Sequence, residues 1–210
     1  MRGMSLARDE RHALVETMEA AGPDAPTLCG DWTTRDLAAH LVLRERRLDA
    51  SAGILIRPLA GYTAKVQAEI AARPYPDLLE LVRTGPPVWS PLWLLDTQAN
   101  LGEMFVHHED VRRAGAGWEP RELGARWEAA LWTLATRMGR MAYRKAPCAV
   151  VLDGGPGRRA AVHGGSGDQV VLSGAPAELA LHAFGRDAVR VEFDGPEDAV
   201  AAVRALQRGV

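Results

Sequence analysis

Three residues of this sequence have the side chains and the spacing to bind one metal ion. Glu103 and His107 are four positions apart in the segment NLGEMFVHHED, and His40 lies far upstream in the segment DLAAHL. Positions i and i+4 project from the same face of a helix, so Glu103 and His107 can hold one ion together. If a neighbouring helix supplies His40 as a third ligand, one coordination position stays open for water or substrate, as in catalytic metal sites.

The helix that carries Glu103 and His107 has one narrow polar stripe bordered by apolar residues. At about 100° per residue the stripe contains Asn100, Glu103, His107 and Asp110. Such a stripe either faces solvent or lines a polar pocket between helices. The apolar remainder of the helix, and the inward direction of His40 from a leucine-rich stripe, favour the pocket, because the interiors of helix bundles are where facing helices build metal sites.

Two further residues near these motifs each allow two interpretations. Asp110, one turn after His107, is either an acceptor for the ring N–H of His107 that faces away from the metal or a surface carboxylate paired with Arg113. Cys29 is either a nucleophile or a thiol packed in a loop. No residue close to Cys29 in the sequence would activate it, which favours the packed thiol.

The elements that must position these residues are helical over the first two-thirds of the chain. Ser5 and the pair Thr33 and Asp36 have the types and spacing of helix N-caps. Apolar residues at helical spacing predict helices over 6–21, 34–50, 59–72, 76–84, 97–115 and 120–143, with Asp96 or Thr97 capping the helix over 97–115.

The pattern changes near residue 145. Three β-prone runs, 149–152, 160–163 and 169–172, are separated by the glycine clusters 154–157 and 164–167, which are typical of hairpins. A helix over 176–184, a strand over 189–193 and a helix over 196–206 follow. The sequence therefore predicts two domains, a helical one over 1–145 and a small α+β one over 146–210.

Composition excludes several classes of function. The chain has 210 residues, a net charge of −2 and an apolar fraction of 47%, which are ordinary for a globular protein that binds neither nucleic acid nor an anionic membrane. No segment approaches the roughly 18 uncharged apolar residues of a membrane span, and the N-terminus lacks a secretory h-region. Two cysteines make no disulfide framework. These features predict a cytoplasmic protein.

Several segments together resemble one protein family. The segment 28–41, LCGDWTTRDLAAHL, resembles the second-helix signature of the mycothiol-dependent maleylpyruvate isomerase family, within the DinB-like superfamily. The segment 103–112, EMFVHHEDVR, resembles the second metal motif of that family, and the segments 172–186 and 194–197 are similar to its small C-terminal domain. The resemblance covers nearly the whole chain.

This resemblance implies a mainly α protein, in which a DinB-like four-helix bundle precedes the small α+β domain. It implies a divalent metal, usually zinc, held by His40, Glu103 and His107. In the enzymes of the family the metal activates the thiol of mycothiol for attack on a small electrophile, which is consistent with the lowered pKa of a metal-bound thiol. Arg186 is the candidate for the arginine with which the family's isomerase holds a carboxylated substrate.

Three hypotheses follow from these observations. The protein is a metal-dependent isomerase or S-transferase whose partners are a small thiol and a small-molecule substrate. Alternatively, it is a non-catalytic, metal-dependent ligand-binding or stress-response module. In the third hypothesis it is a helical interaction protein whose polar stripe contacts a partner, which requires His40 to lie far from Glu103.

Overall fold

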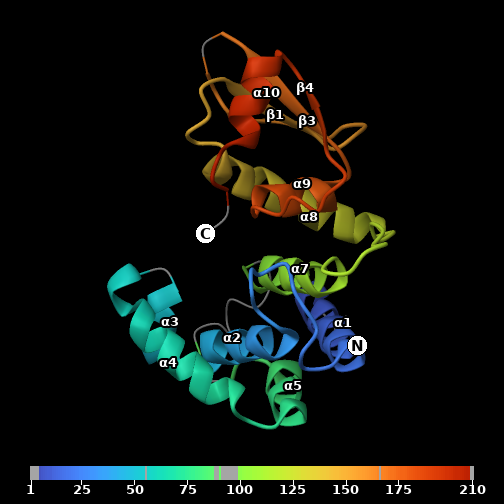
Figure 1. The fold of residues 1–210 in the computed structure, drawn as a ribbon. Helices are drawn as coiled ribbons and strands as arrows, with labels where there is room; N and C mark the ends of the chain where they lie inside the picture. Colours follow the sequence, from blue (N-terminus) through green and yellow to red (C-terminus); the bar gives the residue numbers. More distant parts are fainter. Residues whose placement is uncertain (1–4, 55, 88–89, 91–98, 166, 209–210) are drawn as a thin grey trace. The chain divides into compact units, whose positions relative to one another are not determined.

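The computed structural model describes residues 5–54, 56–87, 90, 99–165 and 167–208. The chain divides into two compact units, 1–118 and 119–210 (Figure 1). The sequence predicted a boundary near residue 145. The structure instead groups helix α8, Ala125–Ala142, with the second unit, because α8 packs against helix α9 and strand β2 of that unit.

The first unit is helical, and most of its helices lie where the sequence predicted them. The helix predicted over 34–50 is divided at Arg47 into α2 and α3, and 3-10 turns η1 (Ala52–Ile54) and η2 (Arg57–Leu59) follow. The α-helices of the unit are α1 (Leu6–Ala21), α2 (Thr34–Arg46), α3 (Leu48–Ser51), α4 (Ala60–Ala71), α5 (Tyr75–Thr84) and α7 (Ala99–Arg112).

Side-chain caps fix the starts of α1 and α2. Ser5 accepts a hydrogen bond from the backbone N–H of Arg8, and Thr33 and Asp36 form a capping box in which each side chain accepts from the other's backbone N–H. These bonds satisfy N–H groups that the first turn leaves without partners, so both predicted caps are confirmed. The cap predicted at Asp96 or Thr97 lies outside the described residues.

An apolar core and a buried ion pair join α1, α2 and α5. Fully buried leucines, among them Leu14, Leu41 and Leu78, contribute to the core. Beside it, both guanidinium nitrogens Nη1 and Nη2 of Arg11 donate to the carboxylate of Glu45, at 3.0 and 2.5 Å, and Nη1 also donates to the Val82 carbonyl at 2.9 Å. Each helix of the three therefore contributes one group to this hydrogen-bonded cluster.

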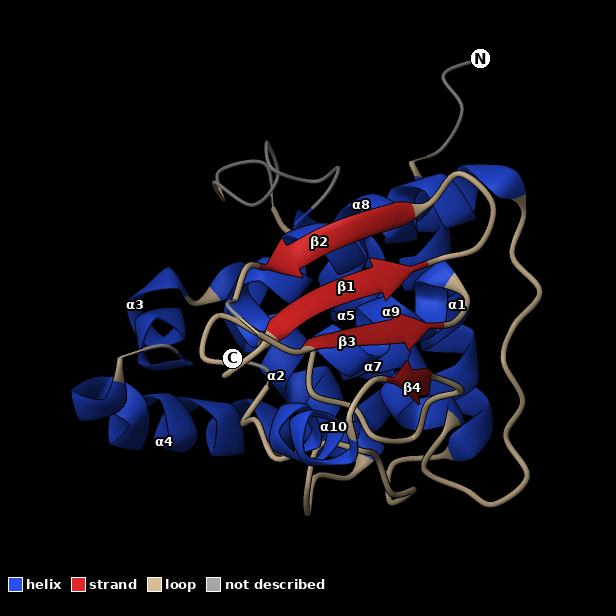
Figure 2. Ribbon diagram, turned by 90° about the horizontal axis from the view of Figure 1, so that it is seen from above, coloured by secondary structure: helices blue, strands red, loops and turns tan. Residues whose placement is uncertain are grey.

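The second unit contains a four-stranded sheet with the order β2-β1-β3-β4 (Figure 2). The strands are β1 (Ala149–Asp153), β2 (Arg159–His163), β3 (Gln169–Ser173) and β4 (Glu192–Asp194). Strands β1 and β2 form the predicted antiparallel hairpin. The second glycine cluster does not close a hairpin, because β3 crosses over and pairs in parallel with β1, and β4 pairs antiparallel with β3.

Helices α8, α9 (Pro176–Ala183) and α10 (Glu197–Arg204) complete the second unit. Gly139 of α8 lies so close to the sheet that an added Cβ would be 3.1 Å from Val162 and 3.2 Å from Leu152. The absence of a side chain at this position allows close packing of helix on sheet. The fold as a whole is mainly α with a C-terminal α+β part, as predicted from the sequence.

His182 of α9 is a buried histidine held in its neutral form. Nη1 of Arg208 donates to Nε2 of His182, so the ring proton lies on Nδ1, which is 2.6 Å from the Tyr143 hydroxyl oxygen. Burial lowers the pKa of His182 to about 3, the cation of Arg208 acts in the same direction, and Asp187 opposes them.

This depressed pKa predicts acid sensitivity of the second unit. The unfolded chain takes up a proton on His182 below about pH 6.5, and the folded chain excludes that proton, so stability falls as the pH drops from about 6.5 toward 3. We expect a loss of about 1.4 kcal/mol for each pH unit in this window. Urea unfolding at pH 7.5 and 5.5 measures it. The loss of unfolding free energy between the two pH values should be smaller in His182→Gln and unchanged in the control His12→Gln. An equal loss in all three proteins would contradict the role of His182.

No helix among the residues that the structure describes is long and apolar enough to cross a membrane.

Candidate metal centre

Helices α2 and α7 bring together the three residues that the sequence singled out. Oε1 of Glu103 lies 3.3 Å from Nε2 of His107, on the same helix, and 3.5 Å from Nε2 of His40 on α2. One donor atom from each residue lies within 4.8 Å of the other two. Both histidine side chains are about nine-tenths buried, whereas 23% of the Glu103 side chain is exposed. Solvent therefore reaches the cluster mainly at the carboxylate.

These separations suit coordination of one small divalent ion. Nitrogen and oxygen ligands at about 2.0–2.2 Å from a tetrahedral ion lie about 3.3–3.6 Å apart, and the two measured separations fall in that interval. Two imidazoles and one carboxylate are also the donors of catalytic sites that keep a position open. The residues present thus fit a divalent metal in both geometry and chemistry.

The electrostatics of the cluster favour a cation. Burial opposes ionisation of Glu103, but hydrogen bonds from His107 and His40 outweigh burial and hold the pKa of the carboxyl well below its ordinary value. Burial likewise opposes protonation of His107, but its contacts with Asp110, Cys29 and Glu103 raise the pKa of the imidazole well above its ordinary value. His107 therefore lies where positive charge is stabilised, and a metal ion at Nε2 would take the place of one proton.

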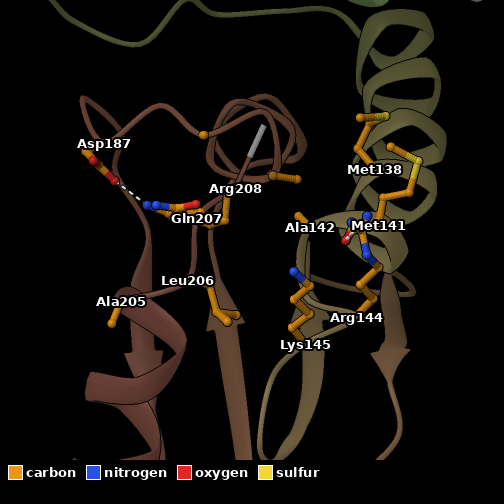
Figure 3. Close-up of a pocket in the computed structure, with 12 residues that line it drawn as sticks. Met138, Met141, Ala142, Arg144, Lys145, Asp187, Ala205, Leu206, Gln207 and Arg208 are labelled. Atoms are coloured by element: carbon orange, nitrogen blue, oxygen red, sulfur yellow. Dashed lines mark hydrogen bonds and ion pairs between the residues drawn. The ribbon is translucent and has the colours of Figure 1, made fainter. Parts of the chain in front are cut away.

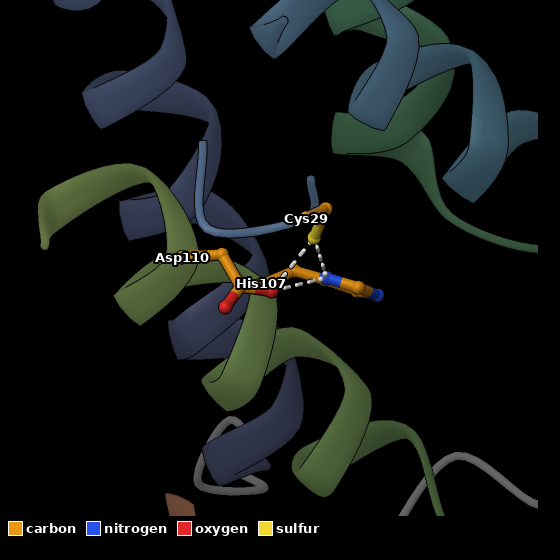
Figure 4. A group of neighbouring side chains, drawn as sticks. All are labelled: Cys29, His107 and Asp110. Carbon is orange, nitrogen blue, oxygen red and sulfur yellow. Dashed lines mark hydrogen bonds and ion pairs between the residues drawn. The ribbon is translucent and has the colours of Figure 1, made fainter. Parts of the chain in front are cut away.

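Asp110 and Cys29 lie on the other side of the His107 ring (Figure 4). Oδ2 of Asp110 is 2.9 Å from Nδ1 of His107, and Asp110 is fully buried. A carboxylate in this place keeps the proton on Nδ1 and leaves Nε2 as the ligand atom. The alternative of a surface carboxylate is wrong, because Asp110 is fully buried.

Cys29 is placed by a loop that is attached to α7. The backbone N–H of Leu28 donates to the Asp110 carbonyl at 3.0 Å, and the Thr27 hydroxyl accepts from the backbone N–H of Cys29 at 3.1 Å. The thiol donates to Asp110 Oδ2 at 3.0 Å, and Sγ is 3.8 Å from Nδ1 of His107. Thiol and carboxylate face the same ring nitrogen, whereas a Cys–His–Asp triad needs them at opposite nitrogens. The arrangement supports a packed thiol.

Sequence reasoning did not identify Arg44. Its Nε lies 3.4 Å from Oε1 of Glu103, so a cation stands beside the three proposed ligands. Arg44 follows His40 by four positions, so the sequence already indicated that the two side chains share one face of the helix.

Arg186 belongs to the second unit and follows the end of α9. Its Nη1 donates to the Phe184 carbonyl at 2.9 Å. The residues on either side of it, Gly185 and Asp187, line a pocket of about 780 Å³ (Figure 3). The lining of this pocket is richer in cations than in anions: Arg144, Lys145 and Arg208 contribute to it together with Asp187.

Fold and site together define a two-unit protein whose helical unit carries a His–Glu–His donor set and whose second unit is a small α+β layer. The crystal structure of the mycothiol-dependent maleylpyruvate isomerase has this fold, with a TM-score of 0.60, 20% identity and coverage of 90% of both chains. A histidine-to-alanine mutant of that isomerase gives a TM-score of 0.60 and 17% identity, again over 90% of both chains. At these identities the similarity establishes a shared fold, the one that the sequence resemblance implied. Comparison with models of protein families and with curated proteins gives no significant match.

Proposed function

We propose that the first unit binds one zinc ion through His40, Glu103 and His107. In this proposal the protein is a cytoplasmic isomerase or S-transferase that uses a small thiol, and that thiol is mycothiol. The single observation that carries this proposal is the convergence of three donor atoms from α2 and α7 at separations suited to one ion. The shared fold with a mycothiol-dependent isomerase supports the choice of thiol chemistry.

The chain's own groups have separate tasks in this proposal. A bound metal would lower the pKa of a thiol and so supply a nucleophile at neutral pH. Asp110 holds a proton on Nδ1 of His107 and fixes the orientation of that ring. The indole of Trp32 packs against His40, with ring centroids 5.0 Å apart, and limits the rotation of the imidazole. The partly exposed Glu103 leaves the open side of the site near its carboxylate.

Arg186 is the proposed contribution of the second unit. A guanidinium can bind both oxygens of a carboxylate, which makes Arg186 the candidate anchor for a carboxylated substrate. The small α+β unit would then take part in substrate recognition, and the helical unit would hold the metal and the thiol.

Metal analysis followed by thermal unfolding tests the proposal. We expect the purified protein to contain about one zinc ion per chain and mycothiol to raise its melting temperature, because a ligand that binds only the folded state stabilises it by about 2.7 kcal/mol at one hundred times its Kd. S-Methylated mycothiol, which lacks the free thiol, is the matched control and should give a much smaller shift. Protein that binds zinc but does not respond to the thiol would favour the non-catalytic module. Protein that binds no divalent metal would overturn the proposal.

A further inference from the structure

Arg44 occupies a position beside the proposed metal ligands that metal binding itself does not explain. It lies one turn after His40 on α2, and its side chain is 17% exposed. Nε is 3.4 Å from Oε1 of Glu103, and Nη1 donates to the side-chain oxygen of Asn100 at 3.0 Å. Both contacts are with α7, so the guanidinium lies between the two helices that supply the donor set.

The balance of charge at this place favours an anion. A divalent ion and Arg44 together bring three positive charges, whereas Glu103 and Asp110 bring two negative ones, and Asp110 lies behind the His107 ring. A Glu103 that coordinates an ion shares its single negative charge between that ion and Arg44, and the other contact of Arg44 is with the neutral amide of Asn100. A cation that is mostly excluded from water and lacks a full counter-charge attracts a negatively charged ligand strongly.

The guanidinium also has an edge available for such a ligand. Within the described residues, Nη2 of Arg44 has no hydrogen-bond partner, and Nε has only the long contact with Glu103. Nε and Nη2 form one edge of the guanidinium, with two parallel N–H groups that match the two oxygens of a carboxylate.

We propose that Arg44 binds a carboxylate of the substrate next to the open coordination position of the metal. This inference rests on the proposed function and adds to it a specificity residue of the helical unit, which places a carboxylate of the substrate within a few bonds of the atom that the thiol attacks. Arg44 in this view determines specificity and is not a metal ligand.

The competing explanation is that Arg44 only orients Glu103 or raises the local positive potential. Either role would act equally on every anionic ligand of the metal, including a simple thiolate. A carboxylate-binding role instead distinguishes a thiol that carries a carboxylate from one that does not. The experiment therefore compares two thiols of equal length within the same protein.

The full chain is loaded with Co²⁺, whose visible absorption reports binding of a thiolate, and is titrated with 3-mercaptopropionate and with 3-mercapto-1-propanol. We expect the wild type to prefer the carboxylate by about tenfold or more, which is about 1.4 kcal/mol. In Arg44→Gln the preference should fall to about twofold or less, and this ratio of the two affinities is the readout because the lost charge itself weakens the binding of both thiolates. Arg73→Gln removes the same charge from an exposed position of the same unit and should keep the wild-type preference.

The outcomes separate this inference from the function on which it rests. If the wild type binds no Co²⁺, the metal centre itself is wrong. If Co²⁺ binds but the wild type shows no preference, or Arg44→Gln keeps it, only the carboxylate site is overturned. If Arg44→Gln fails to bind Co²⁺, Arg44→Lys is measured instead, since it keeps the charge and loses the forked geometry. Its preference should lie below that of the wild type, and an undiminished preference would overturn the proposal.

Discussion

A His107→Ala variant of the full chain is expected to lose stoichiometric metal, with an affinity for zinc more than about one hundredfold below that of the wild type. Changes in residues that merely orient a ligand typically reduce affinity by about 10–100-fold, so removal of the ligand should exceed that range. His107 also has both of its ring nitrogens engaged, Nε2 toward Glu103 and Nδ1 toward Asp110. Competition with a chromophoric chelator measures the affinity.

Two matched variants make this result specific. Asp110→Asn keeps the size of the side chain but loses the carboxylate that faces Nδ1 of His107, so we expect a reduction of about 10–100-fold. His12→Ala removes a half-buried histidine of α1 outside the donor set and should have no effect. Wild-type affinity in His107→Ala would contradict the assignment of all three ligands, since they were assigned as one set.

Replacement of Arg11 by Ala is expected to destabilise the first unit by about 3–5 kcal/mol. Arg11 and Glu45 are almost completely buried, and the substitution would leave the Glu45 carboxylate without its charged partner. The Val82 carbonyl would also lose a hydrogen bond. Urea unfolding monitored by far-UV circular dichroism, with the midpoint and slope fitted together, measures the loss.

The double variant Arg11→Met and Glu45→Leu is the control for this prediction. Apolar residues of similar volume often replace a buried ion pair without loss of stability, so the double variant should recover most of the 3–5 kcal/mol. A double variant as unstable as Arg11→Ala would show that the lost hydrogen bond to the Val82 carbonyl, and not the unpaired carboxylate, dominates the loss. A single variant with wild-type stability would show that the pair is not buried in solution.

The proximity of His40, Glu103 and His107 was predictable because the patterns that indicate it are local. Glu103 and His107 are related by the repeat of one helix, and the leucine-rich stripe of α2 indicates that His40 faces inward. The same locality explains why the caps at Ser5 and Thr33 were correct: a cap depends on three or four consecutive residues.

The surroundings of the site were not predictable to the same degree. The contact of Cys29 with Asp110 depends on a hydrogen bond between Leu28 and α7, which connects segments about eighty positions apart. No local sequence pattern predicts a contact between segments so far apart in the chain. Likewise the glycines at 164–167 indicate a turn but not which strand comes next to which, and β3 pairs in parallel with β1. The start of α8 was also predicted wrongly, since the helix begins at Ala125 and not at 120.

The separation of His40 from Glu103 along the chain has a consequence for folding. In the proposed metal-bound state, an ion shared by α2 and α7 would connect two points with about sixty residues between them. A link of that span would remove more conformational freedom from the denatured chain than one between neighbouring turns. Metal supply in the cell would then govern how long the protein persists as well as whether it reacts. Chains made during metal starvation would open more often and become substrates for proteolysis.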